Sequence, residues 1–208
     1  MSDLRRLRRE RLETEYTELV AFSRKSNGAI QITPQGSAPY EKYTVVFNIR
    51  TIVSPRPTYS ERTECILSIP PNYPDGVPTL MAVSQPLPWN VNWFVSGNFC
   101  PGSWDDEHSL AGFLFRAARV LQYHPEYINI GSPANADAIS FWTNNLGNSG
   151  IIPCDTTALP DPSGLDIEDE PPPKPRSSIT VKGRSQPQPA PQEQPARSSS
   201  RIVVKKRT

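Results

Sequence analysis

The chain has 208 residues and a formal net charge of +1, so its overall charge gives no reason to expect nucleic-acid binding. No stretch approaches the roughly 20 consecutive apolar residues that span a bilayer, and we expect no membrane partner. The 24 prolines are too many for one compact domain, and nearly half of them follow Ile152. We therefore expect a folded domain over residues 1–152 and a disordered, proline-rich tail with a basic C-terminus over residues 153–208.

The three cysteines, Cys65, Cys100 and Cys154, show neither zinc-type pairing nor C-x-x-C spacing. The first residues do not resemble a signal peptide, so we expect free thiols in a reducing, cytoplasmic compartment. His108 follows an acidic run, but the sequence offers no further ligands to complete a site. We expect neither a metal nor a cofactor.

Residues 3–24 predict a helix that Asp3 caps and Asn27-Gly28 ends. Its approximate apolar stripe consists of Leu4, Leu7, Leu12, Tyr16, Leu19 and Val20. Its other face carries Arg5, Arg6, Arg8, Arg9 and Arg11. These arginines form either a solvated helix face or a docking surface for an acidic protein partner. Nucleic acid is disfavoured because no aromatic residues are interleaved with the basic run.

Four strand-like segments follow, at residues 29–33, 42–53, 62–69 and 79–83. Their connections are rich in Pro, Gly and Ser, which predicts an antiparallel meander with one face packed on a helix. Cys65 alternates with other apolar residues, so we expect it in the core.

Two further helices are expected after the meander. Ser109 predicts the cap of the first, whose apolar residues recur at helical spacing until Pro125 stops it. Ser132-Pro133 predicts the start of the second, and Ile151-Ile152-Pro153 is expected to lie back on the domain. The fold class is therefore α+β.

The stretch from Asn90 to Trp104 has Asn, Gly, Ser and Pro spaced between aromatic residues. This pattern predicts an ordered loop that its rings anchor to the domain. Cys100 lies on this loop. A thiol that is held in place and still reachable suits a carrier or nucleophilic role.

The order of elements resembles that of the ubiquitin-conjugating enzymes over roughly residues 3–146. Tyr73-Pro74 is similar to the family's Tyr-Pro turn, and Gly97 precedes Cys100 by three residues, as the family's Gly precedes its catalytic cysteine. Asn92 precedes Cys100 by eight residues, at the place of the Asn in the family's His-Pro-Asn motif. Three further matches are Trp104, Ser109 and the segment 132–138.

The chain also departs from the family pattern. Asn90 and Val91 replace the His and Pro of the motif, the gap from Cys100 to Trp104 is short, and the segment 123–130 is long. These departures indicate a divergent member. Such forms are known from bacterial operons that also encode a ubiquitin-like protein, an activating enzyme and a deubiquitinating-type protease, which raises a role in antiviral defence.

The resemblance implies a transferase with a ubiquitin-conjugating-enzyme-like fold. Cys100 would receive a ubiquitin-like protein as a thioester from an activating enzyme and pass it to an amine on a target protein. Asn92 would stabilise the tetrahedral oxyanion or bond the loop backbone, and both roles stay open. Ser132 occupies the family's gate position. In the family the first helix meets the activating enzyme, which assigns that contact to Arg5, Arg8 and Arg9.

Two alternatives remain. The chain could be a non-catalytic scaffold of the same fold that binds a ubiquitin-like protein or another partner. It could also be an adaptor that works through its tail, where residues 177–182 and 199–206 are β-prone and could add as strands to a partner's sheet.

Overall fold

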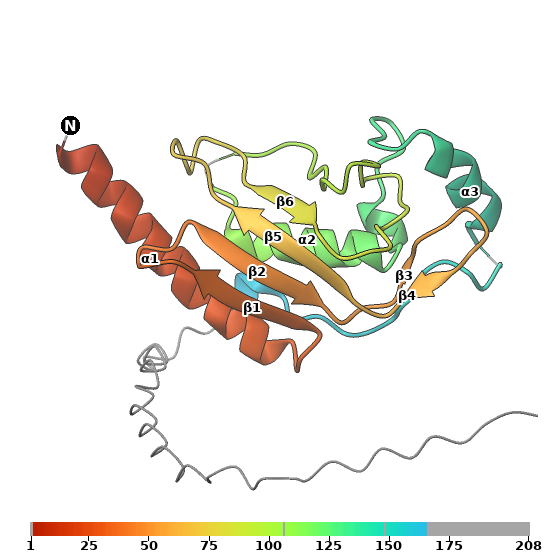
Figure 1. Ribbon diagram of the computed structural model, residues 1–208, viewed down its shortest axis with the longest axis horizontal. Coiled ribbons are helices and arrows are strands. Elements are labelled where there is room, and N and C mark those ends of the chain that lie inside the picture. The colour runs from red at the N-terminus through yellow and green to blue at the C-terminus, as the bar shows by residue number, and fades with distance from the viewer. Residues whose placement is uncertain (1, 106, 148, 166–208) are drawn as a thin grey trace, which may run out of the picture. The chain divides into compact units, whose positions relative to one another are not determined.

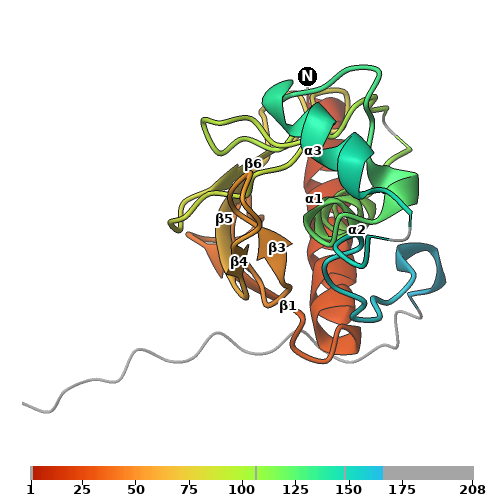
Figure 2. The same cartoon turned by 90° about the vertical axis from the view of Figure 1, so that its right-hand side faces the viewer.

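The computed structural model describes residues 2–105, 107–147 and 149–165 (Figure 1). A four-stranded antiparallel sheet has the order β1-β2-β5-β6, and helices α1 and α2 lie on one of its faces (Figure 2). The strands are β1 (Ile30–Gln35), β2 (Lys42–Phe47), β5 (Thr63–Ser68) and β6 (Thr79–Ala82). The helices are α1 (Ser2–Lys25), α2 (Leu110–Leu121) and α3 (Asp137–Asn145). The predicted α+β class, N-terminal helix and antiparallel sheet are confirmed.

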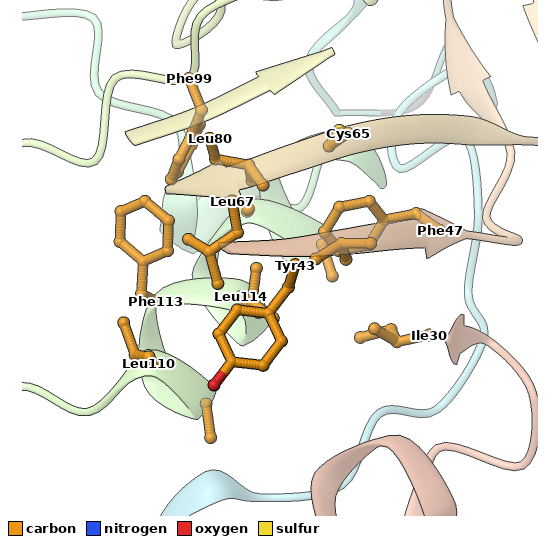
Figure 3. Close-up of a cluster of buried hydrophobic side chains, with 14 of the residues drawn as sticks. Ile30, Tyr43, Phe47, Cys65, Leu67, Leu80, Phe99, Leu110, Phe113 and Leu114 are labelled. Carbon is orange, nitrogen blue, oxygen red and sulfur yellow. The ribbon is translucent and has the colours of Figure 1, made fainter. Parts of the chain in front are cut away.

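Alternating apolar residues build the core between the sheet and α2. Tyr43 and Leu67 are fully buried and lie opposite each other on β2 and β5. Figure 3 shows Leu110, Phe113 and Leu114 of α2 in this cluster with the inward residues of the strands. Ser109 caps α2 as predicted, because its hydroxyl accepts the N–H of Gly112 (3.1 Å). Cys65 lies in this core, also as predicted.

The segment 42–53 is not one strand. It divides into β2 and a short strand β3 (Thr51–Ile52), which pairs with β4 (Tyr59–Ser60) in a separate two-stranded sheet. The ladder ends at Phe47, and between β2 and β3 the backbone N–H of Arg50 donates to the carboxylate of Asp155 (2.8 Å) instead of to a strand.

The first turns of α1 also differ from the prediction. Leu4 and Leu7 were expected in the buried stripe, yet 74% and 54% of their surfaces are exposed. The buried stripe begins only at Leu12 and continues with Leu19 and Phe22. The N-terminal end of α1 thus presents leucines as well as arginines to solvent.

The last predicted helix begins later than expected. Ser132-Pro133 precedes α3, which starts at Asp137 without a side-chain cap. The reason lies in the preceding backbone, because the N–H groups of Ala134 and Asn135 both donate to the carbonyl of Val91 (2.8 and 3.1 Å) and hold 134–135 against the chain near Cys100.

Residues 153–165 pack against the domain, although the sequence places them in the tail. Cys154 donates its N–H to the carbonyl of Gln122 (2.9 Å), and Leu159 and Leu165 pack on the main core. The short helix η2 (Pro162–Gly164) lies against α2. The packed chain therefore reaches at least Leu165. The two β-prone tail segments, 177–182 and 199–206, lie outside the described residues.

Candidate functional site

Cys100 lies at the base of a short antiparallel hairpin, residues 92–100. Trp93 pairs with Phe99, and the N–H of Cys100 donates to the carbonyl of Asn92 (3.0 Å). Phe99 also joins the hairpin to β6, because its N–H donates to the carbonyl of Leu80 (2.9 Å). The expected ordered loop is thus an extension of the sheet, and the position of Cys100 is set by sheet-like hydrogen bonds.

Gly97 is required for this junction with β6. Its φ of +94° lies in the left-handed region, and a Cβ there would lie 2.9 Å from the carbonyl oxygen of Ala82. The carbonyl of Gly97 meanwhile accepts the N–H of Ala82 (2.8 Å) and the indole N–H of Trp93 (2.7 Å). A side chain at this position would push the hairpin away from β6, so the glycine three residues before Cys100 has a structural cause.

Asn92 lies directly beside Cys100 through the backbone, and its side chain is only 4% exposed. Its amide oxygen Oδ1 accepts the backbone N–H of Asn129 (2.9 Å). This bond ties the hairpin to the loop 128–132, which also carries Ser132. This geometry supports the loop-bracing role for the side-chain oxygen Oδ1 of Asn92. The side-chain nitrogen Nδ2 is then the group that could face an oxyanion.

Asn90, which stands where the family has His, is fully buried and uses both ends of its amide. Nδ2 donates to the carbonyl of Val120 in the last turn of α2 (2.9 Å), and Oδ1 accepts the N–H of Asn92 (2.9 Å). One side chain therefore fixes the start of the hairpin on α2. The sequence did not indicate this role for Asn90; its one signal is an Asn two residues before Asn92.

The three thiols differ in their surroundings. Cys65 is fully buried in the core, and burial raises the pKa of its thiol. Burial, with the nearby Asp155 charge, raises the pKa of Cys154 to about 12. The Sγ of Cys154 also lies 3.2 Å from the carbonyl oxygen of Arg50 and 3.4 Å from that of Gln122. Because the thiolate is the nucleophile, both thiols are unsuited to carry an acyl group. Cys100 is half-buried and lies outside the main core.

Residues that resemble family motifs meet around a buried carboxylate. Glu15 of α1, 1% exposed, accepts the hydroxyl of Tyr73 and the backbone N–H of Leu110 at the start of α2 (2.7 Å). Trp104 donates its indole N–H to the carbonyl of Pro74 (2.9 Å). The Tyr-Pro turn, the chain after Cys100 and α1 are thereby joined. Sequence reasoning did not identify Glu15.

The predicted partner-binding arginines behave differently from one another. Arg8 is half-buried and bonds to Glu41 (2.5 Å) and to the carbonyl of Pro70 (3.1 Å), so its charge is used within the domain. Arg9 pairs with Glu13 one turn away (3.2 Å), and both side chains are exposed. Arg5 is exposed. Arg5 and Arg9, with the exposed Leu4 and Leu7, form a surface that we call the α1 tip.

Ser132 is exposed and makes no side-chain hydrogen bond within the described part of the chain. Over the same residues, no group of three His, Cys, Asp or Glu side chains could hold a metal ion. No described helix is both long and apolar enough to cross a membrane.

No family model matches this chain, and no curated protein matches it at a significant level. Solved structures of ubiquitin-conjugating enzymes do match. One from Plasmodium falciparum is 18% identical, with 52% of this chain and 96% of that chain covered and a TM-score of 0.41. The human ubiquitin-conjugating enzyme E2 G1 is 14% identical, with 52% and 91% covered and a TM-score of 0.41.

We predict that iodoacetamide at pH 8 labels Cys100 much faster than Cys154 or Cys65. A thiol with a pKa of about 12 is only about one part in ten thousand thiolate at that pH, and Cys65 is also sealed from solvent. Mass spectrometry of tryptic peptides measures each rate, and guanidinium-unfolded protein, in which all three should label alike, is the control. Faster labelling of Cys154 than of Cys100 in the folded protein would contradict the assignment.

We predict that Asn90→Ala lowers the free energy of unfolding by about 1–3 kcal/mol, because it leaves the buried N–H of Asn92 without a partner and removes one of the two hydrogen bonds to the carbonyl of Val120. Urea denaturation measures the change. Val95→Ala is the matched control, since Val95 is 77% exposed at the hairpin turn and its truncation should cost less than about 0.5 kcal/mol. Equal stability of Asn90→Ala and the unaltered protein would rule out the bracing role.

Proposed function

We propose that this protein is a divergent conjugating enzyme that carries a ubiquitin-like protein as a thioester on Cys100 and transfers it to an amine on a target protein. One observation carries the proposal: Cys100, bonded through its N–H to Asn92, is a half-buried thiol on a hairpin fixed to both β6 and α2, whereas burial raises the pKa of the other two thiols. The motif order in the sequence supports the same function. The partners are then an activating enzyme, a ubiquitin-like protein and a target.

In the first step, the Cys100 thiolate attacks the carbonyl carbon of the thioester on the activating enzyme. A new carbon–sulfur bond forms at Cys100, the old one breaks, and the cysteine of the activating enzyme leaves as a thiolate. Exchange of one thioester for another is close to balanced in free energy, so the thiol needs access and a fixed position more than strong activation. The hairpin hydrogen bonds supply the fixed position.

In the second step, a neutral amine of the target attacks the Cys100 thioester carbonyl. The tetrahedral oxyanion then collapses, an amide bond forms, and Cys100 leaves as a thiolate; the amine's proton passes to solvent or a nearby acceptor. One well-placed amide donor lowers such a barrier by about 2.7–4 kcal/mol. In the Asn92 side chain only Nδ2 can donate, and we assign it to the oxyanion, while Oδ1 accepts the N–H of Asn129. Ser132, exposed on the same loop, would line the path of the amine.

The decisive test is a Cys100-dependent adduct. We expect the full chain, mixed with ATP and pairs of activating enzyme and ubiquitin-like protein from the same genome, to gain a band on non-reducing gels that a thiol reductant removes. Cys100→Ala should abolish the band, Cys100→Ser should make it resistant to reductant, and Cys154→Ala should keep it. An adduct that survives in Cys100→Ala would refute the proposal.

We further predict that Arg5→Glu with Arg9→Glu slows loading of Cys100 several-fold and leaves stability within about 1 kcal/mol, because both side chains are exposed on the α1 tip. Single-turnover loading measures the rate. Arg56→Glu with Arg62→Glu makes the same change in net charge at exposed positions elsewhere in the domain and should load normally. Equal slowing of both pairs would mean that net charge, and not the α1 tip, controls loading.

A further inference from the structure

An arginine of α2 lies beside the chain that immediately follows Cys100. A Cβ at Gly102 would lie 3.3 Å from a terminal guanidinium nitrogen of Arg116. Two residues span at most about 7 Å, so the guanidinium is within about 12 Å of the Cys100 Cα. Gly102 has a φ of +82° and no side chain, which lets the guanidinium pack closely against its backbone.

Arg116 differs from the other half-buried arginines in the described part of the chain. Arg8 bonds to Glu41, Arg11 to Glu15, and Arg119 to Gln122, while the Arg119 guanidinium also lies over the ring of Phe115. Arg116 forms no ion pair or hydrogen bond within the described residues.

The carboxylates of Asp105 and Glu15 are bonded to groups other than Arg116. The carboxylate of Asp105 bonds to the ring of His108 (2.6 Å) and to the N–H of Glu107 (3.1 Å). Glu15, one helix away, is taken by Tyr73, Leu110 and Arg11. Within the described residues, the N–H donors of the Arg116 guanidinium are therefore not engaged by another side chain or carbonyl.

A chain joined to Cys100 by its C-terminus, if it runs alongside residues 101–102, brings its last residues past this position. An extended chain advances about 3.3 Å per residue, so the second to fourth residues from the thioester come within reach of Arg116. A guanidinium is best matched there by a carboxylate, which can accept two parallel N–H bonds.

We propose that Arg116 is a specificity-determining residue, which selects a carried chain with an aspartate or glutamate among its last few residues before the thioester. This inference rests on the proposed function, and it adds the chemistry of the carried partner. The recognition acts in the loading step and needs no target protein.

Synthetic peptide thioesters test it without knowledge of the natural partner. Six-residue peptides ending in a glycine thioester, with Glu, Gln or Lys at the second, third or fourth residue from the end, are offered to the full-length protein at low salt. Mass spectrometry follows their transfer to Cys100. We expect the Glu peptide at the best position to load roughly two- to fivefold faster than the Gln peptide, the range of an exposed ion pair, and the Lys peptide to load slowest. The Glu advantage should shrink at high salt.

Variants of the chain identify the residue responsible. Arg116→Gln should remove the preference, Arg116→Glu should favour the Lys peptide, and Arg116→Lys should keep part of the preference for Glu. Arg119→Gln is the matched control one turn away and should keep it, because Arg119 is bound to Gln122. Urea denaturation of each variant checks that it is folded, and the rate with the Gln peptide checks that its thiol is intact.

The results that would contradict the proposal differ in what they overturn. Equal loading of all three peptides, or a preference that survives in Arg116→Gln, would overturn the role of Arg116 and leave the carrier function of Cys100 standing. No transfer of any peptide to Cys100, with Cys100→Ala indistinguishable from the unaltered protein, would overturn both. A preference seen only when the acyl group leaves for an added amine would also overturn the assignment to loading.

Discussion

The position of Cys100 depends on one buried side chain, that of Asn90. Its amide spans the carbonyl of Val120 on α2 and the N–H of Asn92, and the carbonyl of Asn92 in turn accepts the N–H of Cys100. Three hydrogen bonds thus lead from the main helix of the core to the thiol. Without the Asn90 side chain, the arm that carries Asn92 would lose this attachment to α2, and the buried N–H of Asn92 would lack its partner.

A second buried group, Glu15, holds the other side of the same region. It joins α1 to Tyr73 and to the first N–H of α2, where the positive end of the helix dipole also favours a carboxylate. Asn90 acts at the end of α2 and Glu15 at its beginning. The helix behind the thiol is therefore fixed at both ends by polar groups, while its middle is held by apolar packing against the sheet.

The sequence was sufficient for the parts of the fold that follow a period. Alternation in β2 and β5, the cap at Ser109 and the helical spacing after it all predicted what the structure has. It was insufficient wherever a distant group decided the local structure. Asp155 binds the backbone of Arg50 between β2 and β3, and the carbonyl of Val91 holds the chain that precedes α3. Neither could be foreseen, because each pairing joins residues more than 40 positions apart in the chain.

In the candidate site, too, the sequence predicts some features and misses those that depend on distant groups. Cys100, Asn92 and Gly97 were found from their spacing, and the hairpin explains why the spacing matters. In the sequence Asn90 is only a departure from the family pattern, and nothing marks Glu15. Buried polar groups whose partners are backbone atoms leave no pattern in one sequence, since any N–H or carbonyl can serve. The bracing roles of Asn90 and Glu15 therefore cannot be read from the sequence.

The charged side chains around the site fall into two groups, those that are paired within the domain and those that are not. Arg8 and Arg11 are committed to carboxylates of the domain, so their loss would first weaken the fold. Arg116 and Arg5 have no such commitment, and a change there alters what the surface offers to another molecule. The presence of an arginine, even in an arginine-rich helix, does not tell whether it supports the fold or is open to another molecule. Its pairing within the domain does. Among the N-terminal arginines, Arg5 is the one of our proposed contacts that has no ion pair within the described residues, and our proposal for Arg116 rests on the same feature.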